Sequence, residues 1–209
     1  DASSFNRRKF GAMRTDARTG LAAFLGADAD EIAITRNTTE SNNMVINGIP
    51  LTANDEVVIW DQNHPTNNVA WDVRAERYGF KVIKISTPPE PNNNEDLIKP
   101  FRDAMTRNTK VLAFSHVSNV SGVALPAKDL CQMASENGVL SHVDGAQTFG
   151  PMAVELHDIG CDFYTGSADK WFCGPEETGV LYVKRDRVEN LFPTIVGIGW
   201  ESALENGAR

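Results

Sequence analysis

Cysteine is scarce in this sequence of 209 residues, and the three that occur (Cys131, Cys161 and Cys173) are far apart. This sparse, odd-numbered set is not a disulfide framework, and without a CxxC pair or a Cys/His cluster it gives no sign of a zinc site. Long apolar runs are also missing, since no stretch approaches the roughly 20 residues that a membrane-spanning helix needs. The first ten residues are polar and contain no signal-peptide core. We therefore expect no membrane partner and a cytoplasmic location, with an upstream signal left open because the sequence begins on Asp1.

Positive charge is in the minority as well. The 28 Asp and Glu residues outnumber the 20 Lys and Arg residues, for a formal net charge of −8. A surface of that sign repels phosphate backbones, so we expect no nucleic-acid partner. A small anion is still compatible with it, because backbone N–H groups and a few local donors can hold one phosphate.

Short runs rich in β-branched residues alternate with helical patterns along the whole chain. This alternation predicts an α/β fold in three layers, α/β/α, with a mostly parallel sheet, and we expect residues 1–209 to form one domain. The predicted strands cover residues 31–35, 56–60, 81–86, 110–117, 139–143, 162–165 and 179–184, and the predicted helices cover 6–25, 38–48, 66–78, 96–105 and 126–137.

Polar or charged residues follow five of the predicted strands. Ligands bind at the carboxyl ends of the strands in sheets of this kind, so these residues are candidates for a site. Any one of the five segments is an ordinary polar loop by itself, but together they favour a binding site. The segments are residues 36–40, 63–64, 118–119, 144–147 and 167–170.

Two of these segments carry charges that need an explanation. Asp144 ends a buried strand, where a carboxylate either caps the next helix or pairs with a cationic ring nitrogen such as a pyridinium. Lys170 lies 26 residues later, directly before Trp171 and Phe172. Its amine either reaches solvent or is partly desolvated, with the lowered pKa that an imine-forming lysine needs.

Thr38 and Thr39 begin a predicted helix, where their hydroxyls and the backbone N–H groups suit a phosphate and equally suit a plain helix cap.

Taken together, five segments resemble the class V aminotransferase family of fold-type I pyridoxal-phosphate enzymes, which includes cysteine desulfurases, selenocysteine lyases and isopenicillin N epimerase-like proteins. The resemblance extends from Phe10 to Gly199 and is greatest to the epimerase-like branch. The matching segments are TRNTTESNN (35–43), NHPTNN (63–68), SHVSNVSG (115–122), HVDGAQTFG (142–150) and SADKWFCGPEETGVLYV (167–183).

The resemblance implies pyridoxal 5′-phosphate as cofactor, an amino-acid substrate and a homodimer. It implies that Lys170 forms the Schiff base and later moves protons at the substrate's α-carbon, while Asp144 keeps the ring nitrogen protonated. The remaining implied cofactor contacts are His64 on the ring face, Asn119 and Gln147 near the ring hydroxyl, and Thr38, Thr39 and Ser167 at the phosphate.

Two departures from the family pattern affect these expectations. Asp169 stands where the family usually has His, which places a negative charge near the phosphate, a repulsion of about 1 kcal/mol if solvated and more if buried. Family members are also longer, and their small C-terminal domain, with its carboxylate-binding arginine, has no counterpart in residues 1–209.

The resemblance leaves the reaction open between epimerisation, C–S lysis and transamination at the α-carbon. A desulfurase or selenocysteine lyase would need a thiol from the missing C-terminal part, because we expect Cys173 to be a small buried side chain and Cys131 and Cys161 to be structural as well. A truncated, non-catalytic interaction protein is the alternative outside enzymes. A nucleotide-dependent dehydrogenase is disfavoured, since the sequence has no GxGxxG after the first strand.

Overall fold

A seven-stranded mixed sheet organises the computed structural model, which describes residues 3–197. In spatial order the strands are β1 (Ile32–Thr35), β7 (Gly179–Val183), β6 (Phe163–Ser167), β5 (Leu140–Asp144), β4 (Thr109–Ser115), β2 (Glu56–Trp60) and β3 (Lys81–Ile85). Strand β7 is antiparallel to both of its neighbours, and all other pairs are parallel. The predicted mostly parallel sheet is therefore confirmed.

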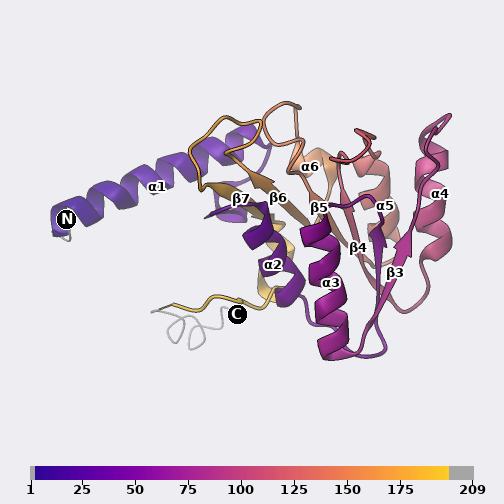
Figure 1. Cartoon of the computed structure of the whole chain (residues 1–209). Helices are drawn as coiled ribbons and strands as arrows, with labels where there is room; N and C mark the ends of the chain where they lie inside the picture. The colour runs from indigo at the N-terminus through magenta and orange to yellow at the C-terminus, as the bar shows by residue number, and fades with distance from the viewer. Residues whose placement is uncertain (1–2, 198–209) are drawn as a thin grey trace.

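Helices cover both faces of this sheet (Figure 1). On one face α2 (Thr38–Gly48) and α3 (Pro65–Tyr78) contribute Val45, Ile46 and Trp71 to a buried cluster with β2 and β4. On the other face α4 (Asn94–Ala104), α5 (Ala127–Glu136) and the end of α1 (Ser4–Phe24) form a second cluster, which includes Phe101 and Leu130. This is the three-layer arrangement that the sequence predicts. The short α6 (Leu156–Ile159) and the 3-10 turns Ala29–Glu31 and Arg185–Asn190 were not predicted.

Capping side chains fix where the two helices nearest the predicted site begin. The Asn37 side chain accepts a hydrogen bond from the backbone N–H of Glu40 at 2.9 Å, so α2 starts at Thr38. His64 caps α3, and Pro65 occupies its first turn, where a missing N–H costs nothing. Both helix N-termini consequently lie where the chain leaves the carboxyl ends of β1 and β2.

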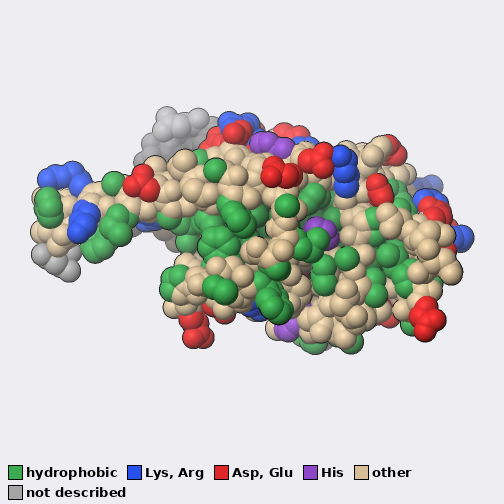
Figure 2. All heavy atoms as spheres, turned by 90° about the horizontal axis from the view of Figure 1, so that it is seen from above, with side chains coloured by type: hydrophobic (Ala, Val, Ile, Leu, Met, Phe, Trp, Pro, Cys, Tyr) green, Lys and Arg blue, Asp and Glu red, His purple; other side chains and the backbone are tan. Residues whose placement is uncertain are grey.

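Helix α1 projects away from the body of the molecule (Figure 1). Its apolar spacing correctly predicts a helix, but within the helix only Ala22 is buried. Phe5, Phe10 and Met13 are 67%, 59% and 54% exposed, and Figure 2 shows apolar side chains along the projecting helix. Among residues 3–197 no helix combines the length and the apolar character that crossing a membrane requires.

Candidate cofactor site

Thr38 at the N-terminus of α2 and Ser167 at the end of β6 are hydrogen-bonded to each other. Both residues are predicted to bind the phosphate. Both the backbone N–H and the hydroxyl of Thr38 lie 2.8 Å from Oγ of Ser167, across 129 residues of sequence. Both residues are buried, while Thr39 is exposed beside them. Hydroxyls and helix N-terminal N–H groups are thereby gathered at one point, which suits an anion.

Asp144 is buried at the carboxyl end of β5 with 3% of its surface exposed. Its Oδ2 accepts hydrogen bonds from Nδ2 of Asn42 at 2.8 Å and of Asn67 at 3.3 Å, and its Oδ1 accepts one from the backbone N–H of Ala146 at 3.1 Å. No Lys or Arg among the described residues forms an ion pair with it. No helix follows it either, because residues 146–148 form a turn. The hydrogen-bond donors to Asp144 among the described residues are thus all neutral, which leaves the carboxylate available to a cationic partner.

Sequence reasoning missed the polar residues that surround Asp144. Oδ1 of Asn42 accepts a hydrogen bond from the Thr165 hydroxyl at 2.7 Å and lies 3.1 Å from Nε2 of His142. A signal existed: Asn42 is one helical turn after Thr38, and His142 shares a strand face with Asp144 two residues on. Burial lowers the pKa of His142, while the nearby charge of Asp144 opposes that shift to a smaller extent.

The segment after Asp144 packs against the segment that carries Lys170. The indole N–H of Trp171 donates to Oε1 of Gln147 at 2.8 Å, and the ring of Phe172 stacks on Phe149 at 4.6 Å. The two residues implied at opposite ends of the cofactor are therefore carried by segments in mutual contact. Lys170 itself is exposed. Of the two interpretations of the sequence, the structure therefore agrees with the one in which the amine reaches solvent.

Gly145 lets the chain turn immediately after Asp144. A Cβ atom at this position would lie 2.0 Å from the ring of Tyr164, a distance that no side chain tolerates. The Tyr164 hydroxyl in turn lies 2.9 Å from the Thr148 hydroxyl. The turn is therefore pressed onto β6, which brings the end of β5 close to the strand that leads to Lys170.

The other predicted contacts lie in loops at the same edge of the sheet. His64 is half-buried, with Nδ1 2.8 Å from the Thr66 hydroxyl, and Asn119 is exposed after β4. Asn63 accepts a hydrogen bond from the Ser115 N–H at 2.6 Å, which holds the loops after β2 and β4 together. Asp169 is exposed, so the solvated figure of about 1 kcal/mol applies to its repulsion of a phosphate. The cofactor contacts of these residues stay predictions.

The cysteines divide into two groups. Cys131 and Cys161 are buried, as expected of structural side chains, and burial raises the pKa of the Cys131 thiol to about 12 and that of Cys161 well above its usual value. Cys173 is exposed, and the expectation that it would be buried was wrong. Its backbone has φ 56°, in the left-handed region that non-glycine residues rarely adopt.

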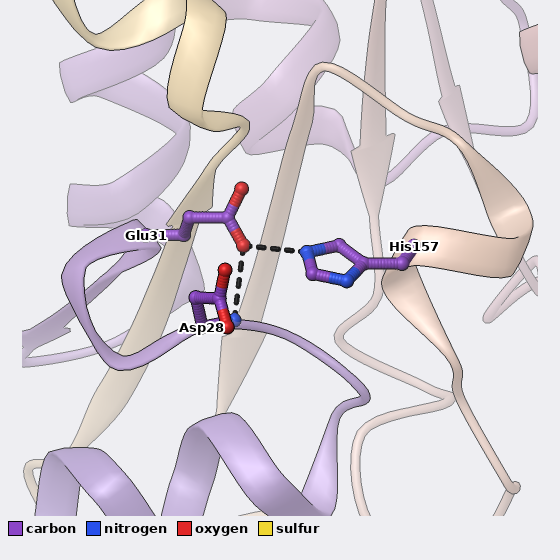
Figure 3. Close-up of side chains that lie close together, drawn as sticks. All are labelled: Asp28, Glu31 and His157. Atoms are coloured by element: carbon purple, nitrogen blue, oxygen red, sulfur yellow. Dashed lines mark hydrogen bonds and ion pairs between the residues drawn. The ribbon is translucent and has the colours of Figure 1, made fainter.

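Three potential metal ligands lie close together in Figure 3: Asp28 and Glu31, which precede β1, and His157 on α6. Oε2 of Glu31 accepts from the Asp28 N–H at 3.0 Å and lies 2.7 Å from Nε2 of His157, while its Oε1 accepts from the Arg185 N–H at 2.9 Å. The Arg185 guanidinium also pairs with Asp28 and Asp30. Burial by itself raises the pKa of Glu31, but these hydrogen bonds outweigh it and the net shift is downward. The carboxylate oxygens are thus already engaged in a structural network.

Comparison with known proteins agrees with this fold. The sequence profile described as aminotransferase class-V matches residues 3–203. The isopenicillin N epimerase of Streptomyces clavuligerus is 32% identical over 97% of this chain and 51% of its own length. A cysteine desulfurase of Haloferax volcanii is 34% identical over 87% of this chain and 43% of its own. A solved cystine C–S lyase, in complex with its reaction product cysteine persulfide, superposes with a TM-score of 0.88 at 26% identity and covers 93% of this chain and 52% of that one.

The chain belongs to the class V aminotransferase family. It spans about half the length of the curated relatives that it matches. The family consists of pyridoxal-phosphate enzymes, and the cofactor is pyridoxal phosphate.

The residues at this edge fit that cofactor chemically. A cationic pyridine ring matches the unpaired charge of Asp144, and a phosphate matches the hydroxyls and N–H groups at Thr38 and Ser167. The buried Oδ1 of Asn67, whose amide contacts Asp144, has no hydrogen-bond partner within residues 3–197. This oxygen lies beside Asp144 and is a free hydrogen-bond acceptor for a donor on a bound group.

Proposed function

We propose that this chain is the large cofactor domain of a pyridoxal-phosphate enzyme that acts at the α-carbon of an amino acid or amino-acid-derived substrate. The observation that carries the proposal is Asp144, a buried carboxylate bound by three neutral donors. Burying a carboxylate costs free energy unless a cation pairs with it, and the protonated ring nitrogen of the cofactor is such a cation. The proposed domain comprises residues 1–209, of which 1–2 and 198–209 lie outside the described residues.

Each predicted residue has a definite task in this proposal. Asp144 stabilises positive charge on the ring nitrogen, and Lys170 both holds the cofactor covalently through Nζ and moves the proton at the substrate α-carbon. Bound pyridoxal phosphate supplies an electron sink for the charge that develops there. The other contacts are His64 against the ring face, Asn119 and Gln147 at the ring hydroxyl, and Thr38, Thr39 and Ser167 at the phosphate, with Asp169 opposing phosphate binding.

The reaction that follows α-proton removal is left open between epimerisation, C–S lysis and transamination. Relatives named as an epimerase and as cysteine desulfurases agree equally with removal of that proton. If a desulfurase reaction is involved, Cys131 and Cys161 do not supply its thiol, because both are buried with raised pKa values. The thiol is then either the exposed Cys173 or a cysteine in a part of the protein outside residues 1–209.

The test is a titration of the full-length protein with pyridoxal phosphate, followed by visible absorbance. We expect saturable binding by the unaltered protein and a loss of affinity of at least about tenfold in Asp144→Asn, which keeps the shape but removes the charge. Asp61→Asn, an exposed carboxylate after β2, is the matched control and should bind normally. Failure of the unaltered protein to bind would contradict the proposal and favour a non-catalytic interaction protein.

The proposal includes a cytoplasmic homodimer in which a second copy covers the exposed apolar side chains of α1. Phe5, Phe10 and Met13 are all more than half exposed on a helix that leaves the body of the domain (Figure 2). Apolar groups gathered in this way mark interaction surfaces. Phe10→Glu should therefore shift the mass in solution from dimer to monomer, and an unchanged dimer would remove α1 from the interface.

A further inference from the structure

Four side chains from three elements form a continuous buried network behind the cofactor site. Asn42 comes from α2, His142 and Asp144 from β5, and Thr165 from β6, and none of them is more than 3% exposed. Asn42 is the centre: its Nδ2 contacts Asp144, and its Oδ1 contacts both His142 and Thr165. No residue of this network except Asp144 was predicted from the sequence to take part in cofactor binding.

The chemistry of the four groups fixes the direction of every hydrogen bond. A carboxylate only accepts, so the amide N–H of Asn42 must face Asp144 and its carbonyl oxygen must face away. His142 must then carry its proton on Nε2 in order to donate to that oxygen. Thr165 donates to the same oxygen at 2.7 Å, so two donors hold the amide and the amide cannot flip without losing both.

The charge of the network is set by the same contacts. His142 is fully buried, and burial lowers its pKa, so the ring is neutral at neutral pH. Its surroundings include the edge of the Trp71 ring, with ring centroids 6.3 Å apart, and no cationic side chain among the described residues forms an ion pair within the network. The groups among residues 3–197 that donate hydrogen bonds to Asp144 are therefore all neutral dipoles, and they hold the carboxylate in one orientation.

We propose that Asn42, fixed by His142 and Thr165, is a positioning residue that keeps the Asp144 carboxylate aimed at the pyridine nitrogen of the cofactor. This inference rests on the proposed function and adds to it a residue that does not touch the cofactor itself. Two consequences follow. Removal of the Asn42 amide weakens the preference of Asp144 for a protonated ring nitrogen, and removal of Thr165 or His142 has the same effect in smaller measure, because each acts only through Asn42.

The experiment uses the full-length protein reconstituted with pyridoxal phosphate labelled with ¹⁵N in the ring, so that the ¹⁵N chemical shift reports protonation of that nitrogen. Asn42→Leu replaces the amide by an apolar group of similar size. We expect the apparent pKa of the ring nitrogen to fall by about one unit or more, and the dissociation constant of the cofactor to rise by about tenfold. Asn47→Leu, the same change on the exposed side of α2, is the control and should change neither quantity.

A second variant keeps the test sharp if Asn42→Leu fails to fold. Thr165→Val preserves shape and leaves the Asn42–Asp144 bond in place but removes one of the two donors that fix the amide, so we expect a smaller shift in the same direction. If the ring nitrogen has the same pKa in Asn42→Leu as in the unaltered protein, this inference alone is overturned. If only Thr165→Val folds, an unchanged pKa in that variant has the same meaning. If the unaltered protein takes up no cofactor, the proposed function fails and the inference fails with it.

Discussion

The ring of Phe149 stacks on the ring of Phe172 at a centroid distance of 4.6 Å, with the two planes only 6° from parallel. Phe149 follows Asp144 by five residues and Phe172 follows Lys170 by two, so this stack joins the segments that carry the two charged residues of the proposed site. Gly150 permits the close approach, because a Cβ there would lie 2.5 Å from the backbone nitrogen of Phe172. The position of the lysine thus depends on β5 as well as on β6.

Replacing Phe172 by Ala tests that dependence. The stack is lost and a half-buried ring is deleted, so we expect the free energy of unfolding to fall by roughly 1–3 kcal/mol, as measured by urea denaturation. The affinity for pyridoxal phosphate should fall too, since the Lys170 segment loses its support. Val73→Ala, a truncation on the exposed face of α3, should change neither; an equal effect of both variants would contradict the role of the stack.

Ser167→Ala removes the hydroxyl that both donor groups of Thr38 contact. We expect the free energy of unfolding to fall by about 1–2 kcal/mol, because a buried N–H and a buried hydroxyl lose their partner. Isothermal titration with pyridoxal phosphate should also show weaker binding, whereas Ser135→Ala on the exposed surface of α5 should bind like the unaltered protein. Normal binding by Ser167→Ala would remove this hydroxyl from the phosphate site.

The buried His142 makes stability depend on pH in a defined direction. Because burial lowers its pKa in the folded state, the unfolded chain takes up a proton first as the pH falls below the usual value of about 6.5. Stability is therefore fully present above that value and decreases below it, by at most about 1.4 kcal/mol per pH unit from this group. Denaturation of His142→Gln between about pH 7.5 and pH 5.5 should show a shallower loss than the unaltered protein. A parallel loss in both proteins would show that His142 does not titrate as inferred.

Glu31→Gln tests whether the cluster in Figure 3 is structural. The variant loses the charge that engages His157 and the Arg185 N–H, so we expect a loss of about 1–2 kcal/mol in unfolding free energy. Since the pKa of Glu31 is lowered, the stabilisation by this group is present at neutral pH and is lost as the pH falls through the folded-state value. Thermal unfolding should be unaffected by a chelator or by added zinc; a rise in melting temperature with zinc that Glu31→Gln abolishes would make the cluster a metal site.

Much of the fold could be predicted because its signals are local. The EVVIW run became β2 with the predicted bounds, Glu56–Trp60, and the helix predicted over residues 38–48 is α2. The exposure of Phe10 on α1 could not be predicted, because helical spacing tells that a stripe is apolar but not whether another element covers it. The family motifs indicated Asp144 and Ser167 by their positions after strands. They gave no role to Asn42 or His142, whose importance arises only when α2 packs on β5 and β6.

In the proposed function, the Asp144 carboxylate and the Lys170 amine serve opposite ends of one pyridoxal-phosphate ring. The most direct measurement is borohydride reduction of the full-length protein after incubation with the cofactor, followed by peptide mapping by mass spectrometry. We expect a single pyridoxyl adduct on the peptide that contains Lys170, and no adduct in Lys170→Ala. An adduct on another lysine, or no adduct in the unaltered protein, would contradict it.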